Sequence, residues 1–318
     1  MTQELTTPVV AIAESPLPGR GQRRGTRVRR DGIEVPRGAR WWAEIGWRHI
    51  VGIVGGLFAV FPVLYILSAS VNPLGTVSST SIIPQQFGLG NFETLLSGSK
   101  GPFGQWYLNT LVLCLVVSAL QVLLSALAAY AFSRFRFYGR RGGLLALLLI
   151  QIFPQFLAVV ALFLLIAQIG DLVPAIGLNT LPGYGLVLMG GALGQVWLIK
   201  GFFDSIPNEL DEAARMDGAG HFRTFVSIIL PLVTPVLAVT GLLVFVSVIG
   251  EFILASIFLT DNSVKTLAVG MFGIIAGDRS NNLGVFAAGS VMIALPVLAL
   301  FLYLQRFIIG GLTAGSVK

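Results

Sequence analysis

Cysteine and histidine are almost absent from this chain, which has one cysteine and two histidines in 318 residues. The single thiol, Cys114, cannot form a disulfide within the chain, and its apolar surroundings in the sequence predict a small core residue. His49 and His221 are too few for a histidine-rich metal site. We therefore expect no disulfide framework and no metal site.

Charged residues are also scarce. Asp, Glu, Lys and Arg make up 11% of the chain, against about a quarter in a typical soluble domain. Hydrophobic residues make up 55%, and the mean hydropathy is +0.83. This composition is typical of a membrane protein and does not fit the soluble domains that the length alone would suggest.

Sequence motifs for common enzyme chemistry are missing as well. There is no G-x-x-x-x-G-K-[ST] phosphate loop, no H-E-x-x-H and no G-x-S-x-G. The paired glycines Gly190-Gly191 lack the strand–turn–helix setting of a nucleotide loop. In a membrane helix, Gly190 and Gly194 are instead expected to let a neighbouring helix approach closely. We expect no catalytic residue and no cofactor in this chain.

Long apolar segments dominate what is present, and each is as long as the ~20 residues that a helix needs to cross a bilayer. None alternates with the period of two that marks an outer-membrane strand. We therefore expect an all-α membrane protein with six transmembrane helices, over about residues 50–71, 107–132, 143–169, 184–203, 232–259 and 283–304. Prolines within or at the ends of these segments are expected to kink them, namely Pro62, Pro154, Pro235 and Pro296.

Four regions are expected along the chain. Residues 1–40 are polar, Arg-rich and aperiodic, and they predict a disordered cytoplasmic tail, with an arm that binds nucleic acid or lipid headgroups as the alternative. Residues 41–49 contain three tryptophans and predict a short interfacial helix. The six-helix domain follows over residues 50–306, with a cytoplasmic loop at 201–230, and residues 307–318 are expected to form a C-terminal tail.

Positive charge is distributed unevenly between the segments that connect the spans. All but three of the 21 Lys and Arg lie in segments that share the side of the N-terminus, and the exceptions are Lys100, Lys265 and Arg279. Cytoplasmic segments carry the excess of Lys and Arg, so both termini are expected in the cytoplasm. This topology accounts for the pI of about 9.8, which leaves membrane lipid and not nucleic acid as the expected partner.

Two polar residues in the predicted spans are candidates for lining a pathway. A charged side chain at the centre of a span costs about 2.5–3.5 kcal/mol on insertion scales, so such a residue usually faces a cavity or a partner. Glu251 is the ionisable residue expected deepest in a span, where it would line the pathway. The alternative is that Glu251 lies nearer the outer interface or that another helix satisfies its carboxylate. Gln151 either lines the pathway or hydrogen-bonds to a neighbouring helix.

Acidic residues are concentrated in "ELDEAARMDGAGHFRTFVSIILP", residues 209–231. Pro207 suits a first helical turn, the acids that follow it favour the positive end of the helix dipole, and Gly218 can adopt the left-handed conformation that stops a helix. We predict a short helix over residues 207–217 with a face of Ala213 and Ala214. A second helix is predicted to begin near Phe222 and to end at Pro231. This hairpin is either solvated or a docking surface.

The spacing within this segment resembles a known motif. Glu212-Ala213-Ala214, Gly218, Ile228 and Leu230-Pro231 stand at the spacing of the EAA motif of permease subunits of bacterial ATP-binding-cassette importers. Other stretches are similar to the carbohydrate branch of that family, and the last of them resembles the second permease of maltose- and trehalose-type importers. They are YLNTL (107–111), AAYAFSRFRF (128–137), IQIFP (150–154), GLNT (177–180) and GLTAGSVK (311–318).

The resemblance covers about residues 45–318 and implies a type I importer permease fold in a prokaryotic cell membrane. It implies that a coupling helix of this chain docks on an ATPase dimer and that the ATPase carries the ATP and Mg. The coupling residues would be Glu209, Glu212, Ala213, Ala214, Gly218, Ile228, Leu230 and Pro231. It also implies a C-terminal ATPase contact through Gly311, Thr313, Gly315 and Lys318. An extracytoplasmic sugar-binding protein would contact Gly277, Asp278, Arg279 and Ser280.

The resemblance further implies a second permease subunit as partner, in a heterodimer that forms the pathway for maltose, maltodextrin or a related α-glucoside. The alternative is a stand-alone secondary carrier or channel. Such a protein needs its own coupling-ion site and often shows internal repeats. The sequence shows neither feature.

Overall fold

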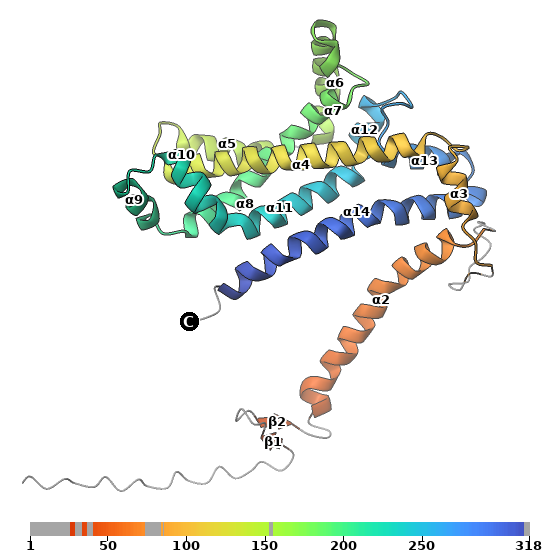
Figure 1. Cartoon of the computed structure of the whole chain (residues 1–318), viewed down its shortest axis with the longest axis horizontal. Helices are drawn as coiled ribbons and strands as arrows, with labels where there is room; N and C mark the ends of the chain where they lie inside the picture. The colour runs from red at the N-terminus through yellow and green to blue at the C-terminus, as the bar shows by residue number, and fades with distance from the viewer. Residues whose placement is uncertain are drawn as a thin grey trace, which may run out of the picture. The chain divides into compact units, whose positions relative to one another are not determined.

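A computed structural model describes residues 26–28, 34–36, 41–73, 84, 86–152 and 155–314. The chain divides into two compact units, Met1–Val63 and Leu64–Lys318. The regular secondary structure of the described residues is helical apart from two three-residue strands (Figure 1). The prediction of an all-α protein is confirmed.

The first unit contains the two strands and the start of the first long helix. Strands β1 (Thr26–Val28) and β2 (Glu34–Pro36) pair antiparallel, with Arg27 opposite Val35. The sequence predicts no regular structure over 1–40, so this pair differs from the expectation, and the other residues of 1–40 lie outside the described residues.

A separate interfacial helix at 41–49 is not found. A π-helical turn, η1 (Trp42–Gly46), runs directly into α2 (Trp47–Ser70), and together they form one helical segment of 29 residues. Gly46 makes the wide turn possible, because a Cβ there would lie 2.5 Å from Cε3 of Trp42. No proline stops the chain before the apolar run begins, so one helix spans both predicted elements.

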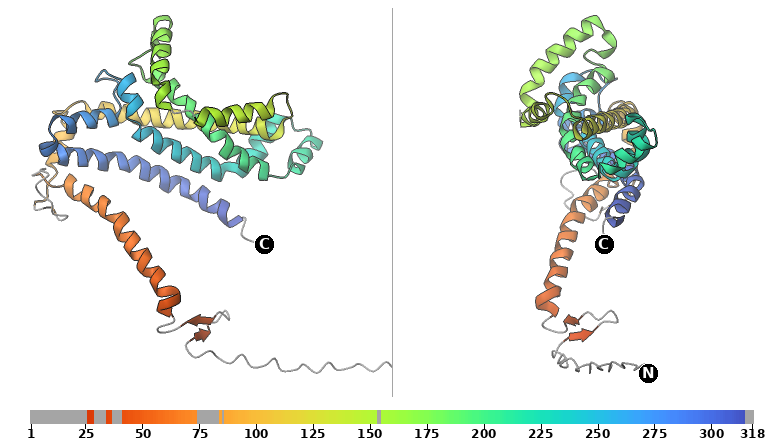
Figure 2. Two further views of the ribbon diagram at one scale, coloured as in Figure 1. Left: turned by 180° about the vertical axis from the view of Figure 1, so that it is seen from behind. Right: turned by 90° about the vertical axis from the view of Figure 1, so that its left-hand side faces the viewer.

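The second unit is built around α4 (Phe103–Arg134). This helix packs against α8 (Ala192–Ser205) and α11 (Leu230–Gly250), and α14 (Arg279–Ala314) packs against α11. Figure 1 and the reverse view in Figure 2 show α4, α11 and α14 side by side. Cys114, Tyr184 and Phe245 belong to one buried cluster along these helices. Cys114 is 0% exposed, as the sequence predicts for a core thiol.

Small and amide side chains bring α4 close to α8 and to the turn before it. Gln121 Nε2 donates to the Leu188 carbonyl at 2.7 Å, and Ser125 Oγ donates to the Ala192 carbonyl at 2.8 Å. A Cβ at Gly191 would lie 2.9 Å from Gln121 Nε2, whereas none of the described atoms lies within 4 Å of a Cβ at Gly190. The close approach predicted at Gly190 therefore occurs at Gly191, because the amide of Gln121 reaches over that residue, and a Cβ at Gly194 would make an ordinary contact of 3.8 Å with Cδ of Gln151.

The third predicted span is not one continuous helix. It consists of α5 (Arg140–Ile152) and α6 (Gln155–Leu172), whose axes differ by 104°. Pro154 lies at the break and outside the described residues, and a proline in a helix removes a hydrogen bond and clashes with the preceding turn. Among the residues that the structure describes, five helices are long and apolar enough to span a membrane, and there are up to six spans if the bent pair counts as one.

The fourth to sixth spans also have bounds that differ from the prediction. The fourth is divided into α7 (Leu181–Leu188), η3 (Met189–Gly191) and α8. The fifth ends at Gly250, before a short helix α12 (Ile253–Phe258). The sixth, α14, continues to Ala314, so residues 307–314 are helical where the sequence predicts a tail.

Side-chain hydrogen bonds fix the segments that the sequence places outside. The predicted loop 260–282 contains the helix α13 (Leu267–Gly277), and η2 (Pro174–Ile176) and α3 (Gly90–Leu96) interrupt the other two segments. Asn179 has a left-handed φ of 55°, and its Oδ1 accepts from the Thr260 and Asp261 backbone N–H groups at 2.7 and 3.1 Å. Trp106 Nε1 donates to the Asn262 carbonyl at 2.8 Å. These bonds tie segments that are far apart in the sequence.

Candidate functional site

The acidic segment contains the short helix α9 (Glu209–Met216), which begins two residues after the predicted start at Pro207. Gly218 follows the helix with a φ of +77°. Its N–H donates to the Arg215 carbonyl at 2.9 Å, and the N–H of Ala219 donates to the Ala214 carbonyl at 2.9 Å. These two bonds form a Schellman motif, which ends a helix at a left-handed residue. The predicted role of Gly218 as a helix stop is confirmed.

Asp211 is not solvated, although the sequence groups it with the other acids of the segment. It is 5% exposed, and its Oδ2 lies 3.0 Å from Nε of Arg134, the last residue of α4. The Nε–H does not point at this oxygen, so the contact is an ion pair without a hydrogen bond. The other guanidinium nitrogens of Arg134 donate to Asn208 Oδ1 at 2.7 Å and to the Ile206 carbonyl at 3.0 Å. Arg134 therefore holds both α9 and the chain that leads into it.

A second set of polar contacts lies beside this ion pair. Ser133 Oγ donates to Asp204 Oδ1 at 2.7 Å, and Lys200 forms an ion pair with the same carboxylate. The hydroxyl of Tyr130 donates to the His221 carbonyl at 3.4 Å. The end of α4 thus contacts the residues before and after α9 as well as α9 itself, and α9 is fixed to the helical bundle.

The two alanines of α9 do not share a face, so that prediction is wrong. Ala214 is 4% exposed and faces the protein, whereas Ala213 is exposed. Neighbouring residues of an α-helix are about 100° apart around its axis, which separates the two side chains. The outward face of α9 carries Ala213, Leu210 and Met216, of which Met216 is 88% exposed, together with the exposed acids Glu209 and Glu212.

The second helix of the segment continues through Pro231 and does not end there. Helix α10 (His221–Thr224), the π-turn η4 (Phe225–Ile229) and α11 form one segment of 30 residues, His221–Gly250. A wider π-turn before a proline leaves room for its ring and needs no N–H from it. Ile229 is fully buried, and Ile228 and Leu230 are half-buried, which indicates that this part of the motif packs the protein interior.

The residues expected to meet a binding protein form a tight corner between two helices. Gly277 ends α13, Asp278 has an extended backbone, and Arg279 begins α14, whose second residue is Ser280. The buried Asn282 braces the corner by donating from Nδ2 to the Ile274 carbonyl at 2.8 Å. Figure 1 places this corner and α9 at opposite ends of the bundle.

The remaining candidate residues are the C-terminal positions and Gln151. Gly311 and Thr313 belong to α14, while Gly315 and Lys318 lie outside the described residues. Gln151 Nε2 donates to the Leu193 carbonyl at 3.3 Å, which is the interhelical bond that the sequence left open. Gln151 lies on α5 and does not contact α9 through this bond.

Glu251 lies just after the end of α11 and not deep within a helix. Its two carboxylate oxygens accept from the N–H groups of Leu254 and Ala255, both at 2.8 Å, at the start of α12. One of them also accepts from the hydroxyl of Tyr184, which belongs to α7. This geometry matches the alternative of a glutamate satisfied by another helix.

The sequence does not predict the roles of Arg134 and Asn179. In the sequence, Arg134 is one of the cytoplasmic positive charges and part of AAYAFSRFRF, and Asn179 is part of GLNT. A weak signal exists for Asn179, because asparagine tolerates a left-handed φ better than most residues. No local pattern shows that Arg134 meets Asp211.

Residues 121–308 match the protein family described as "Binding-protein-dependent transport system inner membrane component". The chain belongs to this family. The match contains the whole of α9 and begins within α4, so the helix and most of its contacts lie inside it. The chain is therefore a multi-pass inner membrane protein and a non-catalytic permease subunit, and ATP hydrolysis belongs to a separate subunit.

Individual relatives are similar over most of the chain. The maltodextrin transport system permease protein MdxG of Bacillus subtilis (strain 168) is 43% identical over 213 residues, which are 67% of this chain and 75% of the relative. The galactooligosaccharides transport system permease protein GanQ of the same organism is 40% identical over 261 residues, which are 81% of this chain and 90% of the relative.

Two solved structures share the fold. A crystal structure of a bacterial ABC transporter involved in the import of the acidic polysaccharide alginate has a chain with a TM-score of 0.70 and 23% identity, over 86% of this chain and 99% of that chain. A second crystal structure, of a bacterial alginate ABC transporter with an alginate pentasaccharide-bound periplasmic protein, gives a TM-score of 0.60 and 17% identity, over 84% and 96% of the two chains. The predicted importer permease fold is confirmed.

Proposed function

We propose that this chain is a permease subunit of an ATP-driven sugar importer and that α9 transmits the closure of the ATPase dimer to the membrane helices. The observation that carries this proposal is the fixed position of α9. Its inward side is held by Arg134 at the end of α4, while its outward face presents Leu210, Ala213 and Met216. A force on that face would be transmitted to α4 through the ion pair of Arg134 with Asp211 and through the hydrogen bonds from Arg134 to Asn208 and Ile206.

The partners that we propose follow from the same arrangement. The exposed acids Glu209 and Glu212 and the residue Ala213 would dock on an ATPase subunit, with Gly218 keeping the helix end rigid. The corner at Gly277 to Ser280 would meet an extracytoplasmic sugar-binding protein at the opposite end of the bundle. The alginate importer structure with its periplasmic protein supports this type of assembly. A second permease would complete the pathway, and the C-terminal residues Gly311 to Lys318 would add an ATPase contact.

Maltose, maltodextrin or a related α-glucoside is the substrate class that we propose. The names of the relatives support sugars in general, since one transports maltodextrin and another galactooligosaccharides. The narrower choice of maltose-type sugars rests on the resemblance of residues 311–318 to the second permease of maltose- and trehalose-type importers. Uptake of labelled maltose by the complete transporter should therefore be inhibited by unlabelled maltodextrin and not by galactooligosaccharides.

The coupling role is tested by Glu212→Lys in the reconstituted complex. Placing a charge of the wrong sign at a protein interface costs roughly several kcal/mol, so we expect sugar uptake to fall by about tenfold or more while the subunits still co-purify. Glu93→Lys is the matched control, because Glu93 is an exposed glutamate on α3 and not on α9. Normal uptake in Glu212→Lys would remove the coupling role.

A stand-alone carrier or channel is the alternative function. The purified chain without other subunits should produce no sugar flux in liposomes, and an ATPase subunit should co-purify with it from the native membrane. Flux through the lone chain, independent of ATP, would favour the alternative.

A further inference from the structure

We infer that the turn between α4 and α5 binds the headgroup of an anionic phospholipid on the predicted cytoplasmic side of the membrane. The site is a surface cavity of about 620 Å³ formed by residues 136–142. It is separate from α9 and from every residue that the coupling proposal uses. The inference depends on the membrane location of the chain and not on the sugar that it transports.

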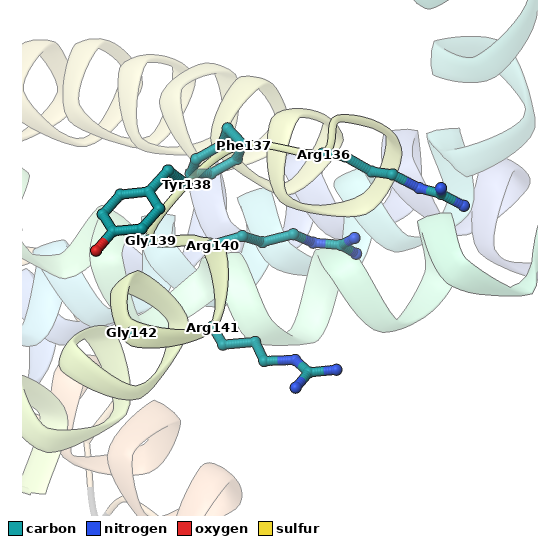
Figure 3. A pocket seen from close by; sticks show the side chains of 7 residues that line it. All are labelled: Arg136, Phe137, Tyr138, Gly139, Arg140, Arg141 and Gly142. Carbon is teal, nitrogen blue, oxygen red and sulfur yellow. The ribbon is translucent and has the colours of Figure 1, made fainter.

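Three arginines give the cavity its charge. Figure 3 shows the guanidinium groups of Arg136, Arg140 and Arg141 extending to the same side of the turn. Arg140 is held in place, because its Nε donates to the Phe132 carbonyl at 2.7 Å and another guanidinium nitrogen donates to the Ser133 carbonyl at 3.3 Å. Within the described part of the chain, neither Arg136 nor Arg141 forms an ion pair with a carboxylate. Their charges are available to a ligand.

The chemistry of these groups selects an oxyanion. A guanidinium presents a planar set of N–H donors that matches phosphate in a bidentate geometry. Figure 3 shows Arg136 and Arg141 on either side of the fixed Arg140, so several donors lie along one side of the turn where a phosphate can bind. Gly139 makes this turn possible because its φ is +85°, a conformation that other residues rarely adopt.

The position of the cavity selects a lipid as the source of that phosphate. Helix α4 is apolar up to its end at Arg134, and α5 begins at Arg140, so the turn between them lies where two apolar helices leave the membrane. Basic pockets at this depth on the cytoplasmic side are typical sites for anionic lipid headgroups. Phe137 and the fully exposed Tyr138 add the aromatic side chains that favour the interface.

An apolar surface for the acyl chains begins beside the arginines. None of the described residues of α5 is buried, and Leu145, Leu149 and Ile152 are all exposed along it. A lipid with its phosphate at Arg141 would have its acyl chains beside these three apolar side chains. Charge at one end and an unbroken apolar surface beyond it are the two features that a phospholipid requires and a free anion does not.

The inference can be tested on the full-length chain, purified with the subunits that accompany it and placed in nanodiscs of phosphatidylcholine with a small fraction of fluorescent phosphatidylglycerol. We compare Arg136→Gln/Arg141→Gln with the control Arg223→Gln/Arg306→Gln, which removes the same charge from two other exposed arginines. We expect the site double variant to weaken phosphatidylglycerol binding by about tenfold or more and the control by about twofold or less.

Each result decides between the lipid and another occupant. Weaker binding in the site variant alone, with wild-type binding unaffected by inorganic phosphate, supports the lipid site. Equal losses in the two double variants would overturn it, because the attraction would then be a general effect of surface charge. Complete displacement of the lipid by inorganic phosphate would identify a free-anion site. Loss of the ATPase subunit from the site variant, with lipid binding unchanged, would make the turn a protein interface.

Discussion

Arg134 and Asp211 form a contact in which neither charge is left to water, since their side chains are 5% and 7% exposed. Taking an ion out of water costs several kcal/mol, and here the cost is offset by the opposite charge and by the bonds from Arg134 to Asn208 and Ile206. A pair of this kind adds little net stability compared with apolar residues of the same size. It becomes costly only when one partner is removed.

Asp211→Ala should therefore destabilise the protein strongly. The buried guanidinium would lose its counter-ion, and we expect the free energy of unfolding to fall by about 3–5 kcal/mol. Thermal unfolding of the purified chain in detergent measures the change. Glu212→Ala is the control, because it removes an exposed carboxylate from the next position and should change stability by about 0.5 kcal/mol or less. A similar small effect for both variants would contradict the assignment of a buried ion pair.

At the scale of elements, local chemistry predicts α9 better than it predicts the membrane helices. The end of α9 follows from Gly218, and its start differs from the prediction by two residues. The break between α5 and α6 and the continuity through Pro231 do not follow from hydropathy. The effect of a proline in a membrane helix depends on which neighbours satisfy the freed carbonyls, and a single sequence does not show this.

Contacts between distant segments account for the rest of what the sequence could not predict. The six apolar segments, the acidic helix and its motif spacing are all visible in the sequence. The partner of Asp211 and the three hydrogen bonds accepted by the Asn179 amide oxygen are set by the packing of whole helices. The alanine pair shows the same limit within α9, because the side of a short helix that is buried is chosen by its neighbours.

Gly218→Ala isolates the conformational cost of ending α9. None of the described atoms lies within 4 Å of a Cβ at Gly218, so the cost comes only from its φ of +77°. We expect a loss of about 1–2 kcal/mol in stability, because a left-handed conformation places Cβ too close to the next carbonyl oxygen. Gly220→Ala is a close control, since Gly220 is equally open but has a φ of −72°. Equal melting temperatures for the two variants would refute this account.

At the scale of the whole molecule, the second unit has two distinct ends. Helix α9 and the turn at residues 136–142 lie at one end of the bundle, and α3 and the corner after α13 lie at the other (Figure 1). Helix α14 runs from that corner back toward the end where α9 lies. This arrangement agrees with the distribution of Lys and Arg, which predicts that the end with α9 is cytoplasmic.

Cysteine labelling tests this orientation with little background, because the one natural thiol is fully buried. Ala213 and Gly277 are both exposed, and they belong to α9 and to the end of α13, which lie at opposite ends of the bundle. A membrane-impermeant maleimide should label Gly277→Cys in intact spheroplasts, and it should label Ala213→Cys only after the membrane is permeabilised. Unmodified protein, which carries only Cys114, should stay unlabelled in both conditions. Labelling of Ala213→Cys in intact spheroplasts would reverse the predicted topology.

The division of the third span has a consequence for how the chain enters the membrane during synthesis. Helix α5 has 13 residues, which at ~1.5 Å per residue give about 20 Å, well short of the ~30 Å hydrocarbon layer. A segment of this length is a poor substrate for insertion by itself. We expect α4 and α5 to leave the translocon together as a hairpin, with Arg136, Arg140 and Arg141 keeping its turn on the side of the ribosome.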